Sequence, residues 1–181
     1  PPSPLRIIGG THKGRRFVAP KSIPARPTTD YAKESLFNIL ENRINWSEVE
    51  ALDLFAGIGG LSFELASRGA EQVTCIDKNF HSIRWISKQQ ALLNLPIITV
   101  KSDALKWLGK AESKYDLVLA DPPYNYDKYD DLIELVLKKA LASNGLFILE
   151  HRHSLNFADH SSFTESRNYG EVEFSFFQNQ S

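Results

Sequence analysis

The fold is decided by the stretch Glu50-Ala-Leu-Asp-Leu-Phe-Ala-Gly-Ile-Gly-Gly-Leu61. It begins with apolar residues around an internal carboxylate, Asp53, and it ends in a turn that holds the glycines Gly57, Gly59 and Gly60. A short apolar run before a glycine-rich turn predicts a buried strand that enters a tight loop. Apolar side chains recur at helical spacing after Gly60, so the stretch predicts strand, turn and helix in succession.

This succession is the first half of a nucleotide-binding β-α-β unit, in which glycines let the backbone pass close to a ligand because they carry no Cβ. The spacing is not G-x-G-x-x-G, because Gly60 follows Gly57-Ile58-Gly59 directly, and this departure disfavours a dinucleotide site. The pattern Asp53-x-Phe55-x-Gly57-x-Gly59 instead resembles the first motif of S-adenosylmethionine (SAM) methyltransferases. A glycine-rich turn without a ligand is the alternative interpretation.

Composition limits the class of protein. The chain has 181 residues, of which 42% are hydrophobic, and a formal net charge of −1, so it can bury one ordinary core and is not basic overall. A single cysteine excludes an internal disulfide and indicates a reducing compartment, so we expect a cytoplasmic protein. No apolar run approaches the ~20 residues that span a bilayer, and the histidines show no spacing typical of a metal site.

The segment from Leu5 to Pro27 is basic and contains no acidic residue. Arg6-Ile-Ile8 and Arg16-Phe-Val18 predict two short strands joined around glycines. A localised cationic arm on a near-neutral chain is expected to bind a phosphate backbone, and a solvated terminus is the alternative. We therefore predict an N-terminal arm, residues 1–27, before a main domain, residues 28–181, and the candidate RNA-binding residues are Arg6, Lys13, Arg15, Arg16 and Arg26.

A helix is predicted directly after the arm. Thr29 or Asp30 can cap its free N–H groups. Its apolar face is formed by Ala32, Leu36, Phe37, Ile39 and Leu40. Lys33 and Glu34 then fall on its more polar side.

Two acidic residues follow predicted strands further along the chain. Asp77 ends the predicted strand Gln72–Asp77, about 20 positions beyond the glycine turn, where a ribose-binding carboxylate lies in such units. Capping of the helix predicted from Phe80 is the alternative role for Asp77. Asp103 follows the predicted strand Ile97–Val100, so it is an N-cap, a ligand contact at the carboxyl end of the sheet, or both.

Tyr115–Ala120 predicts another buried strand, and Asp121-Pro-Pro-Tyr124 follows it directly. Two prolines fix the backbone and remove two N–H donors, so Asp121 and the Pro122 carbonyl present acceptors in a rigid turn. Acceptors beside an aromatic ring suit a planar base that carries an exocyclic amino group. An ordinary Asp-Pro turn with an exposed tyrosine is the alternative, which the glycine turn upstream disfavours.

The rest of the chain completes an α/β fold. We predict a helix from Tyr129 to Leu141 that Asn144-Gly145 ends, a buried strand over Leu146–Leu149, and a hairpin of Phe163–Arg167 and Glu171–Phe177 about Asn168-Tyr-Gly170. Alternating strands and helices predict a mostly parallel seven-stranded sheet with helices on both faces and a C-terminal antiparallel β-hairpin. The arm adds a small N-terminal β-hairpin.

Several motifs together resemble one family. They are Arg6-Ile-Ile-Gly-Gly10, Lys13-Gly-Arg15, Arg26-Pro-Thr-Thr-Asp30, Glu34-x-Leu-Phe-Asn38, Asp53-x-Phe-Ala-Gly57 and Asp121-Pro-Pro-Tyr124. They resemble the bacterial 16S rRNA guanine-N2 methyltransferases of the RsmD type, and the resemblance covers nearly the whole chain. It implies a Rossmann-like class I methyltransferase fold, SAM as the cofactor, no metal, and a monomer whose partner is ribosomal RNA or the small ribosomal subunit.

The resemblance also implies roles for individual residues. The candidate catalytic residues are Asp121, Pro122, Pro123 and Tyr124. The candidate cofactor-binding residues are Thr28, Asp53, Phe55, Ala56, Gly57, Gly59, Asp77, Lys78, Asp103, Ala104 and Asp121. Among these, Asp77 is expected to bind the ribose hydroxyls, and Asp103 with Ala104 to face the adenine. The segment from Arg26 to Asp30 is expected near the methionine carboxylate.

The expected reaction is methyl transfer from SAM to the exocyclic N2 amino group of a guanine in 16S rRNA. The amino lone pair is delocalised into the ring, so acceptors from Asp121 and Pro122 would favour a more nucleophilic nitrogen while Tyr124 stacks on the base. The alternative is an amino-methyltransferase that acts on adenine N6 of DNA or on a tRNA base. Asp-Pro-Pro-Tyr disfavours a third class, a non-catalytic or nicotinamide-binding Rossmann protein.

Overall fold

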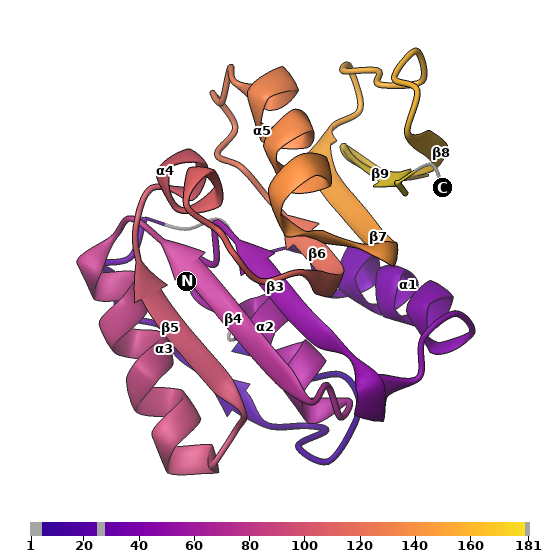
Figure 1. The fold of residues 1–181 in the computed structure, drawn as a ribbon. Helices are drawn as coiled ribbons and strands as arrows, with labels where there is room; N and C mark the ends of the chain where they lie inside the picture. The colour runs from indigo at the N-terminus through magenta and orange to yellow at the C-terminus, as the bar shows by residue number, and fades with distance from the viewer. Residues whose placement is uncertain (1–4, 25–27, 180–181) are drawn as a thin grey trace.

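The computed structural model describes residues 5–24 and 28–179. Its centre is a seven-stranded sheet in the order β5-β4-β3-β6-β7-β9-β8 (Figure 1). In that order the strands are β5 (Ile97–Lys101), β4 (Gln72–Asp77), β3 (Glu50–Leu54), β6 (Tyr115–Ala120), β7 (Leu141–Arg152), β9 (Val172–Phe177) and β8 (Phe163–Tyr169). The pairs from β5 to β7 are parallel, and β9 is antiparallel to both of its neighbours. The predicted mostly parallel sheet is confirmed.

Helices cover both faces of the sheet, as predicted. One hydrophobic cluster joins the sheet to α1 (Asp30–Glu41), α2 (Gly60–Ser67) and α3 (Phe80–Leu93). The other joins the opposite face to α4 (Ala104–Gly109), α5 (Tyr129–Leu135) and the π-helical turn η2 (Val136–Ala140). Figure 1 shows α1 and α2 behind the sheet. A short 3₁₀ helix, η1 (Trp46–Glu48), leads into β3.

The arm forms the predicted small hairpin. Strands β1 (Leu5–Arg6) and β2 (Arg16–Phe17) pair antiparallel, with Leu5 opposite Phe17. The Phe17 ring stacks on Phe63 of α2 with 4.7 Å between centroids and meets Trp85 of α3 edge-on. The hairpin is therefore packed on the main hydrophobic core, and it shares that core with residues 28–181.

Several element boundaries follow local chemistry that the sequence shows. Strands β4 and β6 and helix α3 have the predicted bounds. Thr29 is the N-cap of α1, because its side chain accepts a hydrogen bond from the Ala32 N–H at 3.1 Å. Asp103 caps α4 in the same way, through the Lys106 N–H.

The predicted role of Asn144-Gly145 as the stop of the helix that begins at Tyr129 is wrong, although the helical structure ends within one residue of the predicted Leu141. Helical structure ends at Ala140, and Asn144 and Gly145 lie within β7, near a register shift between β6 and β7. A Cβ on Gly145 would come within 3.0 Å of the Tyr115 carbonyl oxygen of the neighbouring strand. Glycine is therefore required here by a close approach between strands, and not by a helix C-cap.

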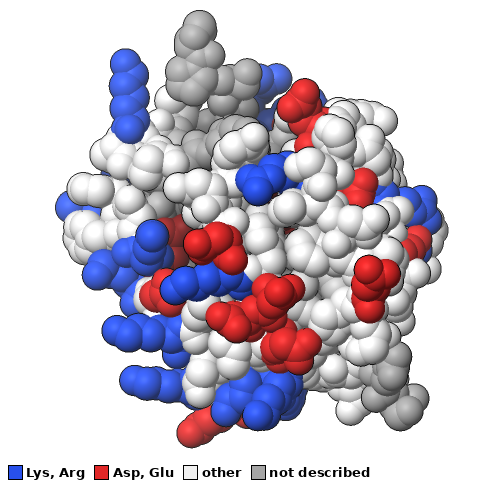
Figure 2. Space-filling view, turned by 90° about the horizontal axis from the view of Figure 1, so that it is seen from above, with Lys and Arg blue, Asp and Glu red and all other residues white. Residues whose placement is uncertain are grey.

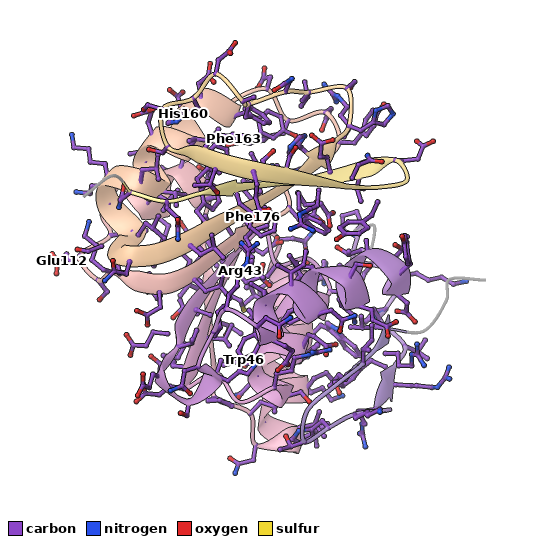
Figure 3. The ribbon with its side chains drawn as sticks, turned by 90° about the vertical axis from the view of Figure 1, so that its right-hand side faces the viewer. Arg43, Trp46, Glu112, His160, Phe163 and Phe176 are labelled. Carbon is purple, nitrogen blue, oxygen red and sulfur yellow. The ribbon has the colours of Figure 1, made fainter. Side chains whose placement is uncertain are left out.

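The C-terminal hairpin is confirmed, but its turn is shorter than predicted. Asn168 and Tyr169 continue β8, and Gly170 turns the chain with a φ of 68°. The second strand, β9, joins β7, which leaves β8 at the edge. Arg43, just after α1, forms an ion pair with Glu165 of β8 and lies 5.4 Å from the Phe176 ring centroid (Figure 3). This contact fastens the hairpin to α1.

The predicted position of Lys33 on the polar side of α1 is wrong. Lys33 is 1% exposed, and its Nζ lies 3.5 Å from Oε1 of the fully buried Glu64 on α2. Nζ also donates to the Arg6 carbonyl oxygen of β1. The arm covers this side of α1, and Glu64 supplies the counter-charge that a buried ammonium group needs.

Candidate functional site

A cavity of about 440 Å³ opens at the carboxyl ends of β3, β4 and β6. Its size lies within the range of small-molecule sites. Ligands of open α/β sheets collect at this edge, because the loops that follow the parallel strands meet there. The predicted residues that line it are Thr28, Asp53, Phe55, Ala56, Gly57, Asp77, Lys78, Asp103, Ala104, Asp121, Pro122, Pro123 and Tyr124. The structure therefore brings the glycine turn and Asp-Pro-Pro-Tyr to one cavity.

Three residues of the glycine turn adopt a left-handed backbone conformation. The φ angle is 62° at Phe55, 58° at Gly57 and 84° at Gly59. Gly59 is the N-cap of α2 and is absent from the cavity lining. A Cβ on Gly59 would lie 2.9 Å from side-chain atoms of Ile86 and Phe63. Gly59 thus allows α2 to pack closely, while Gly57 faces the cavity.

Asp77 connects the two loops that form the cavity floor. Its Oδ2 accepts a hydrogen bond from the Gly57 N–H at 2.8 Å, and its Oδ1 accepts one from the Asn79 N–H at 2.8 Å. The N-cap of α3 is Asn79, whose side chain accepts from His81 and Ser82 N–H groups. Asp77 is therefore not the helix cap, and each carboxylate oxygen retains a second lone pair for a ligand hydroxyl.

Asp53 lies beneath the same turn and is 1% exposed. Burial raises the pKa of its carboxyl group to about 7, and the negative charges of Asp77 and Glu150 act in the same direction. The Ser62 hydroxyl donates to Asp53 Oδ2 at 2.7 Å, which opposes the shift. Asp53 consequently supports the turn from below and titrates near neutral pH.

The Asp-Pro-Pro-Tyr turn forms the wall opposite the glycine turn. Pro122 is buried, whereas Tyr124 is 67% exposed at the mouth of the cavity. The Pro123 carbonyl oxygen accepts a hydrogen bond from the Tyr126 N–H at 2.9 Å, which closes the turn. The Arg152 guanidinium of β7 lies over the Tyr124 ring, 5.1 Å from its centroid. The Tyr126 N–H therefore holds the turn at Pro123, and Arg152 holds it at Tyr124, whose ring is exposed to solvent.

The segment before α1 reaches the cavity through Thr28. The Thr28 hydroxyl donates to Glu150 Oε1 at 3.1 Å, and Glu150 is buried at the end of β7. Lys33 also lines the cavity, one helix turn further on. Its ammonium group is engaged by Glu64 and by the Arg6 carbonyl oxygen, and burial lowers its pKa.

The described cations of the arm are absent from the cavity lining, although Leu5 of β1 and Pro24 contribute to that lining. Lys13, Arg15 and Arg16 are exposed, and Arg6 forms an ion pair with Asp30 at 3.1 Å. Arg26 lies outside the described residues. The loop that carries Lys13 is fixed at the far end of α2, where the Thr11 N–H donates to the Ser67 carbonyl oxygen at 2.8 Å. An eight-residue helix is about 12 Å long, so this loop stands about one helix length from the glycine turn.

Charge is unevenly distributed over the face seen from above. Figure 2 shows several acidic side chains near the middle of this face and most of the Lys and Arg side chains along its left and lower margins. Phosphate groups would meet less repulsion along those margins than over the acidic middle.

Residues 5–178 match the family model described as Conserved hypothetical protein 95. The chain belongs to this family. Ribosomal RNA small subunit methyltransferase D of Escherichia coli is 35% identical over 153 residues, which are 81% of this chain and 74% of that protein. The predicted resemblance to RsmD-type methyltransferases is confirmed.

Two solved structures have folds similar to that of this chain. The structure of the putative methyltransferase yhhF from Escherichia coli has a TM-score of 0.84 and 29% identity, and the match covers 98% of this chain and 99% of that chain. A T. thermophilus 16S rRNA N2 methyltransferase in complex with AdoMet and guanosine has a TM-score of 0.75 and 20% identity, over 98% of this chain and 50% of that chain. The predicted Rossmann-like class I fold is confirmed.

Family motifs identify many of the residues that line the cavity, but others were not predicted as site residues, among them Lys33, Asn79 and Tyr126. Lys33 was assigned to a polar surface, Asn79 follows the expected ribose carboxylate without a motif of its own, and Tyr126 lies two positions beyond Asp-Pro-Pro-Tyr. Proximity to Tyr124 is the only sequence signal that could have indicated Tyr126.

Neither a metal site nor a membrane-spanning helix is found in the part of the chain that the structure describes. Within residues 5–24 and 28–179, no group of three or more His, Cys, Asp or Glu is placed to hold a metal ion. In the same ranges, no helix has the length and apolar character needed to cross a membrane. The cavity thus remains the candidate site among the described residues.

Proposed function

We propose that this chain transfers a methyl group from SAM to the exocyclic N2 amino group of a guanine in 16S rRNA. One observation carries the proposal: the glycine turn, Asp77 and Asp103 line the same cavity as Asp121-Pro-Pro-Tyr124. A cofactor that fills the first part would thereby lie beside a base held by the second. Membership of the RsmD-type family supports ribosomal RNA as the substrate class.

The residues of the cavity fit the cofactor. SAM supplies a methyl group activated by a sulfonium, which gives the cofactor a positive charge at the reacting centre. Carboxylates from Asp53, Asp77, Asp103 and Asp121 line the cavity and suit cationic groups. Asp77 is held by backbone N–H groups, so its remaining lone pairs are preorganised for ribose hydroxyls. Thr28, at the other end, suits the methionine carboxylate.

The Asp-Pro-Pro-Tyr turn would present the amino group to the methyl group. Asp121 and the Pro122 carbonyl can accept its two N–H bonds, which fixes the nitrogen for in-line attack and opposes delocalisation of its lone pair. Tyr124 is 67% exposed, so a ring that enters from solvent can stack on it. A stacked target base inside an RNA helix cannot reach this turn, and the base must be extruded or already unpaired.

The arm would hold the RNA backbone while the cavity performs the chemistry. Its exposed cations are fixed on a packed hairpin, which makes them a rigid surface. Phosphate contacts fix the position of the RNA without reading its sequence. The loop that carries Lys13 stands about one helix length from the glycine turn, which is compatible with contacts to a neighbouring strand or stem of the RNA.

Labelling of nucleic acids from a strain that lacks the gene tests the proposal. The protein and SAM with a labelled methyl group are incubated in three separate reactions, which contain 16S rRNA, tRNA or DNA from that strain. Label in 16S rRNA that maps to guanine N2 is the expected result. Label in adenine N6 of DNA or in a tRNA base would instead establish the alternative amino-methyltransferase, and Asp121→Ala protein serves as the inactive control.

A further inference from the structure

Tyr31, the second residue of α1, is 67% exposed although its ring contacts another tyrosine. It meets Tyr169 of β8 edge-on, with 5.7 Å between ring centroids. Tyr169 is half-buried on the main hydrophobic cluster, where its ring centroid lies 5.8 Å from that of Phe174. The core therefore holds this tyrosine pair, Tyr31 and Tyr169, from one side and leaves most of Tyr31 open to solvent, where the β8–β9 hairpin lies against α1 (Figure 3).

Strand register connects Tyr169 to the mouth of the cavity. Tyr169 lies opposite Val172 of β9, and Val172 lies opposite Arg152 of β7. Opposite residues of an antiparallel pair project from the same face of the sheet, so these three side chains form one row. Arg152, at the end of the row, holds Tyr124 at the mouth of the cavity. Since neighbouring strands are ~4.8 Å apart, the backbone of Tyr169 is about 10 Å from that of Arg152.

The start of α1 approaches the cavity by a second route. Thr28, three positions before Tyr31, lines the cavity, and its hydroxyl donates to Glu150 of β7 at 3.1 Å. Glu150 projects from the same face of β7 as Arg152, because side chains alternate along a strand. The tyrosine pair is absent from the cavity lining, yet it lies beside the wall that carries Tyr124.

The charges around the tyrosine pair suit an anionic partner. Asp30, the acidic residue in the first turn of α1, forms an ion pair with Arg6 of β1 at 3.1 Å and is thereby neutralised. Arg152 forms no ion pair with a carboxylate of the described residues. Exposed aromatic rings flanked by guanidinium groups are typical of surfaces on which unpaired bases stack while their phosphates contact the cations.

We propose that Tyr31 and Tyr169 form a stacking platform for an unpaired nucleotide that neighbours the target guanine in the RNA chain. The inference rests on the proposed function, since it assumes that a guanine of RNA occupies the cavity beside Tyr124. A base that leaves its stack exposes the faces of its neighbours, and the platform replaces part of the stacking that is lost. Every base has a π-face, so the platform holds the strand without selecting its sequence.

Steady-state kinetics with 16S rRNA from a strain that lacks the gene tests the inference on the whole protein. Tyr31→Ala should raise KM for the rRNA about 5- to 150-fold, the effect of losing one stacked base, and should leave kcat unchanged. Affinity for S-adenosylhomocysteine should not change, because the tyrosine pair is outside the cavity lining. Tyr31→Phe keeps the ring and should behave as the wild type does.

Leu92→Ala is the matched control, because Leu92 is apolar, 66% exposed and located on α3, beside β5 at the opposite edge of the sheet (Figure 1). Unchanged KM in Tyr31→Ala, or an equal rise in Leu92→Ala, would overturn the inference. A Tyr31→Phe protein as impaired as Tyr31→Ala would also overturn it, since the hydroxyl and not the ring would then be needed. Wild-type protein that transfers no methyl group to 16S rRNA would contradict the proposed function itself, which separates the two failures.

A short RNA distinguishes stacking from contact with phosphate or with a ribosomal protein. The probe is a pentaribonucleotide with a central guanosine and flanking adenosines, compared with the same chain whose flanking residues are abasic. Wild-type protein should bind the intact probe more tightly, and Tyr31→Ala should lose this preference. Wild-type protein without the preference, or Tyr31→Ala protein that keeps it, would overturn the inference. A defect of Tyr31→Ala confined to assembled small subunits would overturn it as well, in favour of a surface that binds a ribosomal protein.

Discussion

Arg152 at the end of β7 contacts Tyr124 of the Asp-Pro-Pro-Tyr turn in two ways. Its Nη1 donates to the Tyr124 carbonyl oxygen at 2.6 Å, and its guanidinium carbon lies 5.1 Å from the centroid of the Tyr124 ring. No carboxylate among the described residues forms an ion pair with Arg152. The Arg152 cation therefore engages the tyrosine ring and holds the turn that carries it.

Arg152→Ala should raise KM for RNA and lower kcat, because the ring that receives the base loses its support. An exposed cation–π contact with one charge-assisted hydrogen bond is worth about 1–3 kcal/mol, so kcat/KM should fall about 5- to 150-fold. Binding of S-adenosylhomocysteine should stay unchanged. Arg152→Lys, which keeps the charge and one donor, should restore part of the activity.

Arg167→Ala provides a matched control for Arg152, since Arg167 lies on the neighbouring hairpin and pairs with Glu165. It should leave the kinetic constants unaltered. Equal losses in the two variants would show that general surface charge, and not support of Tyr124, accounts for the effect of Arg152.

Asp77→Ala should weaken SAM binding by about 1–3 kcal/mol, because two ribose hydrogen bonds lose their acceptor. Part of the loss would arise from the glycine turn, since the Gly57 N–H also loses its partner. Asp77→Asn retains one carbonyl acceptor and should bind SAM with intermediate affinity. Calorimetry measures both values, and unaltered affinity in Asp77→Ala would assign this residue to the loop structure alone.

Asp121→Ala should lower kcat far more than it weakens SAM binding, because its proposed partner is the amino group in the transition state. Tyr124→Ala should also slow the reaction, whereas Tyr124→Phe keeps the stacking surface and should preserve most of the rate. Single-turnover kinetics with 16S rRNA separates these effects from product release. A Tyr124→Phe protein as slow as Tyr124→Ala would mean that the hydroxyl, and not the ring, is required.

The pKa of Asp53 predicts a dependence of stability on pH. The pKa is raised in the folded protein to about 7, from an ordinary value of 3.8. A raised pKa means that the carboxyl group favours folding when it is protonated, and that this stability is lost as the pH rises through the folded pKa. Between pH 5 and pH 8, wild-type protein should lose about 2–3 kcal/mol of unfolding free energy relative to Asp53→Asn.

Chemical denaturation of both proteins at several pH values measures the effect of Asp53. Asparagine keeps an acceptor for the Ser62 hydroxyl and carries no charge, so it isolates the titration from the hydrogen bond. A constant difference between the two proteins over this pH range would show that Asp53 does not titrate there.

Local sequence signals account for much of the fold. Periodicity predicted the bounds of β4, β6 and α3, and side-chain capping predicted the start of α1 at Thr29 or Asp30, of which Thr29 is the cap. Residues whose role depends on tertiary context were predicted wrongly. Gly145, which follows Asn144, is typical of a helix C-terminus, yet glycine is needed there because the backbone of the neighbouring strand comes close to it. Lysine is usually a surface residue, yet Lys33 is buried because it forms an ion pair with Glu64, which lies 31 positions away in the sequence.

The candidate site shows the same division. Residues within motifs, such as Asp77 and Tyr124, could be assigned because the family pattern fixes their place at the end of a strand. Tyr126 and Arg152 could not, because each is brought to the site by a contact that only the folded chain creates. Neither position has a periodicity or a spacing that distinguishes it from an ordinary loop or strand residue.

Replacement of Arg15 and Arg16 together with Gln should weaken RNA binding and leave SAM affinity unchanged. Both side chains are exposed on the packed hairpin and are absent from the cavity lining, so they can contact phosphate without touching the cofactor. The log–log dependence of RNA affinity on salt should flatten by roughly 0.7–0.9 for each phosphate interaction that the replacement removes. Lys138 and Lys139 near the end of η2, replaced in the same way, remove equal charge from another surface. If both double variants lowered RNA affinity and salt slope equally, net charge would explain the effect; if the arm variant changed neither, the hairpin would serve only to complete the core.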